Sequence, residues 1–302
     1  MKKRRDDTGS PKTAMYGGVL RARVSSQAWK HAMRKDFAEN TPLDVGKRTK
    51  KAAELVKEQI LALDPEQKKA DKMAKDALKH VNITSNDKKG TDALVFISSA
   101  QAKALAELAV EGCTNDEKYE EAMIKNPSAD MVLFGRMVAQ KASLKYDAAA
   151  QVAHNSSTLY RYATVNVMEL AGQLGAEQAA ETVRAFGEAF LFSMPTGKQN
   201  TFANRTLPDA VYVTLREDQP VNLCGAFERA VSRGEQGGYA EASKAALVQY
   251  AQQVYASFVE APAQSFTVGG GLEALAPAQT AKAMLDALEK AVRDALSGNE
   301  VG

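Results

Sequence analysis

Five polar side chains near the N-terminus have the types and the spacing to hold a phosphate group. Ser25 and Ser26 stand directly before Gln27, Lys30 and Arg34, which follow at i, i+3 and i+7, the spacing of one helix face. The first amides of a helix have no partner within it and attract anions, and either serine can cap such a helix. The pattern predicts a helix whose N-terminus and basic face bind phosphate.

The elements around this helix add basic side chains and a core face. Residues 6–11 and Gly17-Gly18 are rich in residues that suit tight turns. Residues 19–24 have the alternation of a short strand, with Arg21 and Arg23 on one face and apolar side chains on the other. The helix itself carries an apolar stripe at helical spacing, formed by Trp29, Ala32, Met33 and Phe37. Loop, strand and helix therefore bring positive charges together.

The charge of the chain is distributed unevenly. Residues 1–50 hold 13 lysines and arginines against 5 aspartates and glutamates, a net charge of +8. The whole chain of 302 residues carries only +2, so the remainder carries −6. A basic end on an acidic body indicates a polyanionic partner. A repeating phosphate backbone explains this many positive groups better than one small anion does.

Composition excludes several other classes of protein. An apolar content of 45% and a charged content of 25% are typical of a globular protein. No apolar run is long enough to cross a bilayer and residues 1–6 lack a signal peptide, so we expect a cytoplasmic protein without a membrane partner. Cys113 and Cys224 show no zinc or disulfide spacing, and Gly197-Lys198 lacks the remainder of a phosphate-binding loop. We expect no cofactor and no metal.

Periodicity predicts helices and strands along the whole chain. Helices are predicted in 48–63 and 65–80, from Ser98-Ser99 to 112, and at 168–174, 176–193, 222–233, 240–259 and 278–296. Strands are predicted at 92–98, 130–138, 158–167 and 210–215. Strands that alternate with helices, but are too few for a long parallel sheet, favour an α+β fold of the ferredoxin-like kind with helical insertions.

Four stretches carry a resemblance to a known family. RDDTGSPKTAMYGGVLRARVSSQAWKHAMRK at 5–35 resembles the opening of the backbone subunit (CasC) of type I-E CRISPR Cascade complexes. LFGRMVA at 133–139, TLYRYATVNV at 158–167 and PTGKQNTFA at 195–203 agree with that family in order. The resemblance implies a non-catalytic subunit that polymerises head to tail along the guide RNA (crRNA). With other Cascade subunits it would present that guide to target DNA.

The resemblance also implies a division of the chain. Residues 1–302 would form one hand-shaped unit with an RRM-like, ferredoxin-like palm, helical fingers at about 40–81 and a thumb. The palm would comprise about 5–39, 82–112, 130–140 and 158–302. Two departures from the family imply a shortened N-terminus and a reduced thumb at about 138–158. Only Met1-Lys2-Lys3-Arg4 precedes Arg5, and the thumb insertion is short where residues 151–154 run directly into 155–158.

The resemblance also implies roles for individual residues. Arg5 and Lys12 match loop residues that contact guide phosphates, while Ser25, Gln27, Lys30 and Arg34 match the strand-to-helix phosphate site. Met137 matches an apolar side chain beside a displaced base, a wedge role with general precedent. Lys198, Gln199 and Asn200 match a loop near the RNA. With Arg21 and Arg23, these residues form the predicted RNA-binding set, and no residue is assigned a catalytic role.

Two alternative functions remain open from the residues alone. Asp6 and Asp7 could hold a divalent metal, which would make the chain a metal-dependent ribonuclease of the related backbone-subunit type. Tyr160 and Tyr162 could instead stack on bases, as in a general single-stranded nucleic-acid-binding protein.

Overall fold

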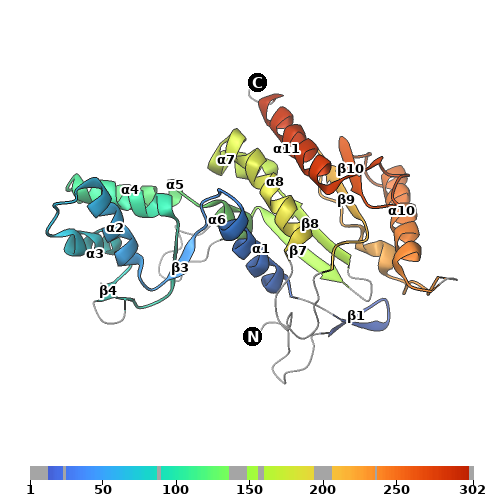
Figure 1. Cartoon of the computed structure of the whole chain (residues 1–302), viewed down its shortest axis with the longest axis horizontal. Coiled ribbons are helices and arrows are strands. Elements are labelled where there is room, and N and C mark those ends of the chain that lie inside the picture. The colour runs from blue at the N-terminus through green and yellow to red at the C-terminus, as the bar shows by residue number, and fades with distance from the viewer. Residues whose placement is uncertain are drawn as a thin grey trace. The chain divides into compact units, whose positions relative to one another are not determined.

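The computed structural model describes residues 13–22, 25–86, 90–135, 148–155, 160–193, 206–234 and 237–298 (Figure 1). These residues belong to two compact units. Unit 1 comprises Met1–Asp36, Gln151–Val167 and Ala176–Gly302, and unit 2 comprises Phe37–Ala150 and Met168–Gly175. No helix within the described ranges is both long enough and apolar enough to cross a bilayer.

Unit 1 combines long helices with short sheets (Figure 1). Its elements are β1 (Thr13–Tyr16), β2 (Val19–Ala22), α1 (Ser26–Asn40, to Asp36 in this unit), β7 (Ala150–Asn155), β8 (Tyr160–Val165), α8 (Ala176–Phe192), β9 (Val211–Leu215), the 3-10 helix η3 (Leu223–Phe227), α10 (Ala240–Ser257), β10 (Gln264–Val268), β11 (Ala278–Gln279) and α11 (Ala281–Gly298). β7 pairs with β8, and β10 lies between β9 and β11. β10 runs antiparallel to β9 and parallel to β11.

The hairpin of β1 and β2 is fixed in place by its turn. The two strands are antiparallel, with Tyr16 opposite Val19. Gly17 in the turn has a φ of 58°, a conformation that suits glycine. A Cβ atom on Gly17 would lie only 1.5 Å from the backbone oxygen of Glu228, so the turn contacts the loop after η3 directly. The predicted turn at Gly17-Gly18 and the predicted strand are therefore confirmed as far as Ala22.

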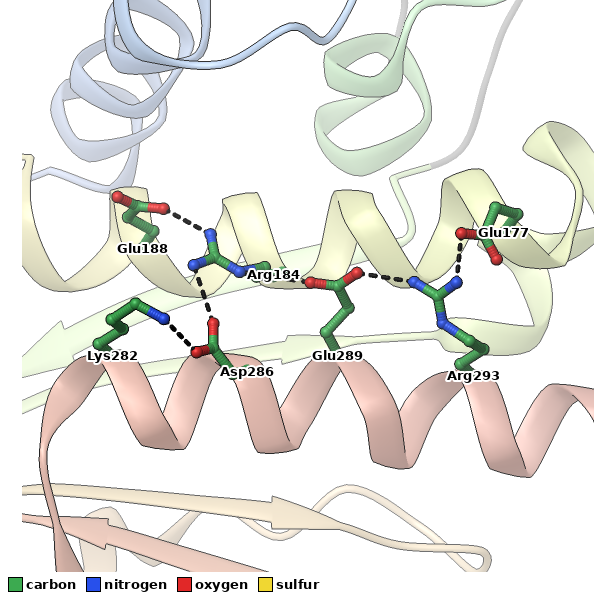
Figure 2. A network of polar contacts seen from close by, with 7 residues as sticks. All are labelled: Glu177, Arg184, Glu188, Lys282, Asp286, Glu289 and Arg293. Atoms are coloured by element: carbon green, nitrogen blue, oxygen red, sulfur yellow. Dashed lines mark hydrogen bonds and ion pairs between the residues drawn. The ribbon is translucent and has the colours of Figure 1, made fainter.

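Helices α8 and α11 lie side by side, and a network of ion pairs joins them (Figure 2). Apolar side chains of α11 such as Met284, Leu288 and Val292 are buried, which accounts for the helical spacing of this stripe. The charged residues of the network are Glu177, Arg184 and Glu188 on α8 and Lys282, Asp286, Glu289 and Arg293 on α11. Arg184 reaches across to Asp286 at 3.2 Å and to Glu289 at 3.3 Å.

Unit 2 is built on a cluster of helices. Its elements are β3 (Lys47–Thr49), α2 (Ala52–Leu63), α3 (Ala70–His80), β4 (Ser85–Asn86), β5 (Gly90–Thr91), β6 (Val95–Ile97), α4 (Ser99–Val110), α5 (Asp116–Lys125), α6 (Ala129–Phe134) and α7 (Val167–Leu174). α2, α3 and α4 contact one another (Figure 1). Their buried side chains include Val56, Ile60, Leu78 and Leu105, which belong to one hydrophobic core cluster. The two predicted helices broken at Asp64-Pro65 are confirmed as α2 and α3.

The start of α4 depends on Ser98, and its loss is expected to destabilise unit 2. The Ser98 hydroxyl accepts a hydrogen bond from the Gln101 amide at 2.9 Å and donates one to the Asn126 carbonyl at 2.7 Å. Replacing Ser98 with alanine removes both bonds, so we expect a loss of about 1–2 kcal/mol in the free energy of unfolding. Urea unfolding followed by far-ultraviolet circular dichroism measures it.

The matched control for this prediction is Ser99→Ala, because Ser99 is exposed and is the first residue inside the helix. Its free energy of unfolding should stay within about 0.5 kcal/mol of the native value. Equal losses of unfolding free energy in Ser98→Ala and Ser99→Ala would show that the hydrogen bonds of the Ser98 cap do not stabilise unit 2.

One predicted strand is a helix instead. Residues 130–138 were expected to form a strand, but α6 covers Ala129–Phe134 and ends at Gly135, whose φ is 75°. Every residue of α6 is buried, so the sequence shows a continuous apolar run without the polar positions that reveal helical periodicity. Tertiary contacts settle the conformation: the Asp130 carboxylate in the first turn accepts hydrogen bonds from the Gly46 amide and the Ser128 hydroxyl.

Two further boundaries differ from the prediction. Residues 222–233 were expected to be helical, but only the short 3-10 helix η3 forms, because side chains of the hairpin occupy its carbonyls at Cys224 and Phe227. The final helix was expected from residue 278, but Ala278–Gln279 pairs with β10 as β11. The helix then begins at Ala281, capped by Thr280.

The class of the fold agrees with the sequence at a coarse level. The described residues form a mixed α and β structure with small sheets. The ferredoxin-like, RRM-like palm and the reduced thumb stay predictions. The structure groups residues 82–112 with 40–81 in unit 2, whereas the sequence divided them between palm and fingers. Residues 150–155 of the predicted thumb region form β7, which pairs with β8.

Candidate nucleic-acid interface

The N-terminus of α1 has the cap that the sequence predicts. Ser25 precedes the helix, and its hydroxyl accepts a hydrogen bond from the Ala28 amide at 3.3 Å. Ser25 is buried, whereas Gln27 in the first turn is exposed. The cap satisfies one of the amides that a helix start leaves without a partner. Ser25 and the α1 residues Gln27, Lys30 and Arg34 are together named the phosphate seat.

Lys30 and Arg34 place two positive charges on the same face of α1. They are four residues apart and therefore one turn apart, and both are half-buried. Burial lowers the pKa of Lys30 from its ordinary value, and the positive charge of Arg34 lowers it further. Two like charges at this spacing repel each other, and an anion bound between them would relieve the repulsion. This geometry suits a phosphate group.

Changing Arg34 is therefore expected to change the titration of Lys30. Arg34→Gln removes the repulsion and should raise the pKa of Lys30. The pKa should stay below its ordinary value, because burial is the larger cause of the shift. An anion bound at the phosphate seat should also raise the pKa of Lys30, because it stabilises the charged amine. The affinity for the anion should therefore fall as the pH rises through that pKa and Lys30 loses its charge. Nuclear magnetic resonance of protein labelled at lysine Cε measures this pKa.

The control is the same titration of Lys30 in Lys51→Gln, because Lys51 is exposed and is not among the charges that shift the pKa of Lys30. The pKa of Lys30 should not change in that variant. An unchanged Lys30 pKa in Arg34→Gln would mean that the two cations do not interact.

Arg21 is buried in unit 1, whereas the sequence grouped it with basic residues that would contact RNA; that role stays a prediction. Its side chain is only 4% exposed, and its Nη2 donates a hydrogen bond to the Phe227 carbonyl at 2.9 Å. Its guanidinium lies 5.0 Å from the centre of the Tyr16 ring. The apolar side chains Met15 and Leu20 are exposed instead, by 65% and 67%. The face of the hairpin that carries Tyr16 and Arg21 is turned toward η3, because these side chains donate hydrogen bonds to its carbonyls. Alternation alone does not reveal which face of a strand is buried.

An arginine outside the predicted set lies beside the seat. Arg161 of β8 stacks on Trp29 in the first turn of α1, with 4.2 Å from its Cζ atom to the ring centre. It also lies 4.9 Å from the ring centre of Phe190 on α8. The sequence did carry a signal for it. Arg161 falls on the same face of the predicted strand as Leu159, Ala163 and Val165, where a charged residue is unusual.

A sequence model of the CT1975-like protein family matches residues 4–155 and 154–293, which is nearly the whole chain. The chain belongs to the CT1975-like protein family.

Solved structures similar to this CT1975-like chain extend the comparison. A chain of a "CRISPR RNA-guided surveillance complex" is 28% identical, with a TM-score of 0.72, and the match covers 95% of this chain and 94% of the other. A chain of a "CRISPR RNA-guided surveillance complex, pre-nicking" is also 28% identical, with a TM-score of 0.70 and 95% coverage of both chains. No curated protein sequence matches.

Several predicted residues of the CT1975-like chain lie outside the described residues, and their roles stay predictions. They are Arg5, Lys12, Arg23, Met137, Lys198, Gln199 and Asn200, together with the candidate metal ligands Asp6 and Asp7. Among the described residues, no group of three or more histidine, cysteine, aspartate or glutamate side chains could hold a metal.

The two tyrosines proposed for base stacking have partners inside the CT1975-like chain. The Tyr160 hydroxyl donates a hydrogen bond to Asn222 Oδ1 at 3.3 Å, and its ring centre lies 5.1 Å from that of Phe227. Burial raises the pKa of both Tyr160 and Tyr162. Partly enclosed rings have less free surface for bases, so this arrangement favours phosphate contacts over a stacking platform.

Proposed function

We propose that this CT1975-like chain is an RNA-binding backbone subunit of a CRISPR surveillance complex. The observation that carries the proposal is its match, over about the full length of both chains, to chains of CRISPR RNA-guided surveillance complexes. The phosphate seat supports it, because half-buried Lys30 and Arg34 lie on one face beside a capped helix N-terminus. The guide RNA is the polyanion that the basic N-terminal end would bind.

The proposed mechanism is electrostatic and geometric. Contacts to phosphates hold a strand without reading its bases, so the edges of the guide stay free to pair with target DNA. Copies of the chain would join head to tail, because a heterologous interface that does not close produces an open filament. We place this assembly in a Cascade complex of type I-E, with this chain as its CasC subunit and with the other Cascade subunits as partners.

We further propose that the chain does not cut RNA. Asp6 and Asp7 would then hold no catalytic metal. Incubating the RNA-bound protein with Mg²⁺ tests this directly. Intact RNA is the expected result, whereas cleavage that is abolished by Asp6→Ala or Asp7→Ala would make the chain a ribonuclease.

Stoichiometry on RNA of graded length tests the backbone role. We would add purified protein to single-stranded RNAs of increasing length and unrelated sequences, and weigh the complexes by native mass spectrometry. A backbone subunit should add one copy for each fixed increment of nucleotides, whatever the sequence. A single copy on every length, or a continuous spread of occupancies, would contradict the proposal.

A further inference from the structure

Arg161 is enclosed by side chains from two helices of unit 1. Its guanidinium carbon lies 4.2 Å from the ring centre of Trp29 on α1 and 4.9 Å from that of Phe190 on α8. Its Nη2 donates a long hydrogen bond of 3.4 Å to the Leu191 carbonyl. Cation–π contacts of this kind contribute about 0.5–2 kcal/mol each. The stack therefore joins β8, α1 and α8 at the first turn of α1.

No described residue neutralises the charge of Arg161. No carboxylate among the described residues pairs with it, and its buried Nη1 atom has no hydrogen-bond partner there. Burial alone lowers the pKa of Arg161 to about 10, and no acidic neighbour raises it. Arg161 is half-buried, and withdrawing a cation from water without a counter-charge costs free energy.

Arg216 in the same unit also stacks on an aromatic ring, but a carboxylate neutralises its charge. Its guanidinium also lies over an aromatic ring, 5.4 Å from the centre of Tyr255, and its side chain is only 6% exposed. Asp218 accepts hydrogen bonds from its Nε at 2.8 Å and from its Nη2 at 2.7 Å. Both arginines stack on a ring and have a buried Nη1 atom without a hydrogen-bond partner. They differ in the carboxylate: Asp218 pairs with Arg216, whereas no described carboxylate pairs with Arg161.

Arg161 contacts the first turn of α1, so its positive charge lies near the start of that helix. Trp29, on which it stacks, is 3% exposed and is the residue directly before Lys30. A buried positive charge in a low-dielectric environment acts on a nearby anion more strongly than an exposed charge does. Clamping Trp29 also fixes the turn that carries the cap and the first basic side chain of the phosphate seat.

We propose that Arg161 is a positioning residue of the phosphate seat: it fixes the first turn of α1 through Trp29 and supplies an un-neutralised positive charge beside it. This inference rests on the proposed function, since it assumes that the seat binds the phosphates of RNA. Arg161 does not touch the RNA in this arrangement. Its loss should weaken binding without removing a phosphate contact.

The experiment compares Arg161→Met and Arg161→Lys with the matched control Arg216→Lys in the full chain, using a single-stranded RNA of mixed sequence. We expect Arg161→Met to weaken binding about tenfold, which corresponds to about 1.4 kcal/mol. The slope of log affinity against log salt should stay unchanged, because no phosphate contact is lost. Arg216→Lys should bind as the native protein does.

Arg161→Lys separates the charge from the packing. A lysine enclosed at this position should have a lowered pKa, so its RNA affinity should fall between pH 7 and pH 9 more steeply than that of the native protein. A purely structural role would give no such additional pH dependence. Trp29 is the single tryptophan of the chain, so its fluorescence should change in both Arg161 variants and stay constant in Arg216→Lys.

The outcomes are distinct. Native affinity in Arg161→Met, or native pH dependence in Arg161→Lys, would overturn the inference while leaving the proposed function intact. A salt slope lowered by about 0.7 in Arg161→Met would also overturn it, because Arg161 would then contact a phosphate itself. If the native protein binds no RNA at all, the proposed function fails first. Circular dichroism of each variant identifies any loss of folding, in which case Arg161→Lys decides the matter.

Discussion

Replacing Lys30 and Arg34 together with alanine is expected to weaken RNA binding roughly 100-fold at low salt, for every RNA sequence alike. The two side chains share a face of α1 beside its capped N-terminus, and burial together with the charge of Arg34 lowers the pKa of Lys30. Each phosphate contact on a single strand contributes about 0.7 to the slope of log affinity against log salt. The slope should therefore fall by about 1.4 when both are lost.

The matched control is Lys75→Ala with Lys79→Ala on α3. These lysines have the same spacing of four residues and the same total charge, but they pair with Asp71 and Asp76 in unit 2. Their loss should leave both the affinity and the salt slope near the native values. Fluorescence anisotropy over a range of salt concentrations measures both quantities. A native slope in the Lys30 and Arg34 variant would remove these residues from the site.

Replacing Arg21 with methionine is expected to do the opposite: to destabilise the protein and leave the salt slope unchanged. The change removes the buried hydrogen bond to the Phe227 carbonyl and the contact with the Tyr16 ring. An unsatisfied buried carbonyl costs about 1–3 kcal/mol, and the ring contact contributes about 0.5–2 kcal/mol. We therefore expect a loss of about 2–3 kcal/mol in the free energy of unfolding. Urea unfolding followed by Trp29 fluorescence measures it.

Arg34→Met is the control for Arg21→Met, since it removes the same group from a half-buried position on α1. It should change the free energy of unfolding by less than about 0.5 kcal/mol and lower the salt slope. The reverse pattern, with a stable Arg21→Met variant that has a lowered salt slope, would return Arg21 to the RNA surface that the sequence predicted.

Helices whose apolar stripe or cap lies within their own residues were predicted well. α2, α8 and α10 carry apolar stripes at helical spacing, and α4 has its Ser98 cap together with such a stripe. Local pattern and local cap are both visible in one sequence. The cap of α1 was predicted for the same reason, because Ser25 directly precedes the helix that carries Lys30 and Arg34. Phosphate binding at these residues stays a prediction.

Features that depend on distant contacts were missed. The Phe227 carbonyl that turns Arg21 inward is more than 200 residues away in the chain. α6 is buried on all sides, so its apolar run resembled a strand. β10 exists through its pairing with β9 and β11, which local propensity does not specify. Arg161 belongs to this group too, since its partners Trp29 and Phe190 come from different helices.

The nucleic acid that accompanies the protein when it is purified from cells tests the central claim most directly. We would extract it, treat it with ribonuclease or deoxyribonuclease, and determine its length and the number of protein copies per strand. The proposed function predicts RNA of discrete length that is protected by several copies of the chain. Heterogeneous RNA, DNA, or no nucleic acid at all would contradict a role as the backbone of an RNA-guided complex.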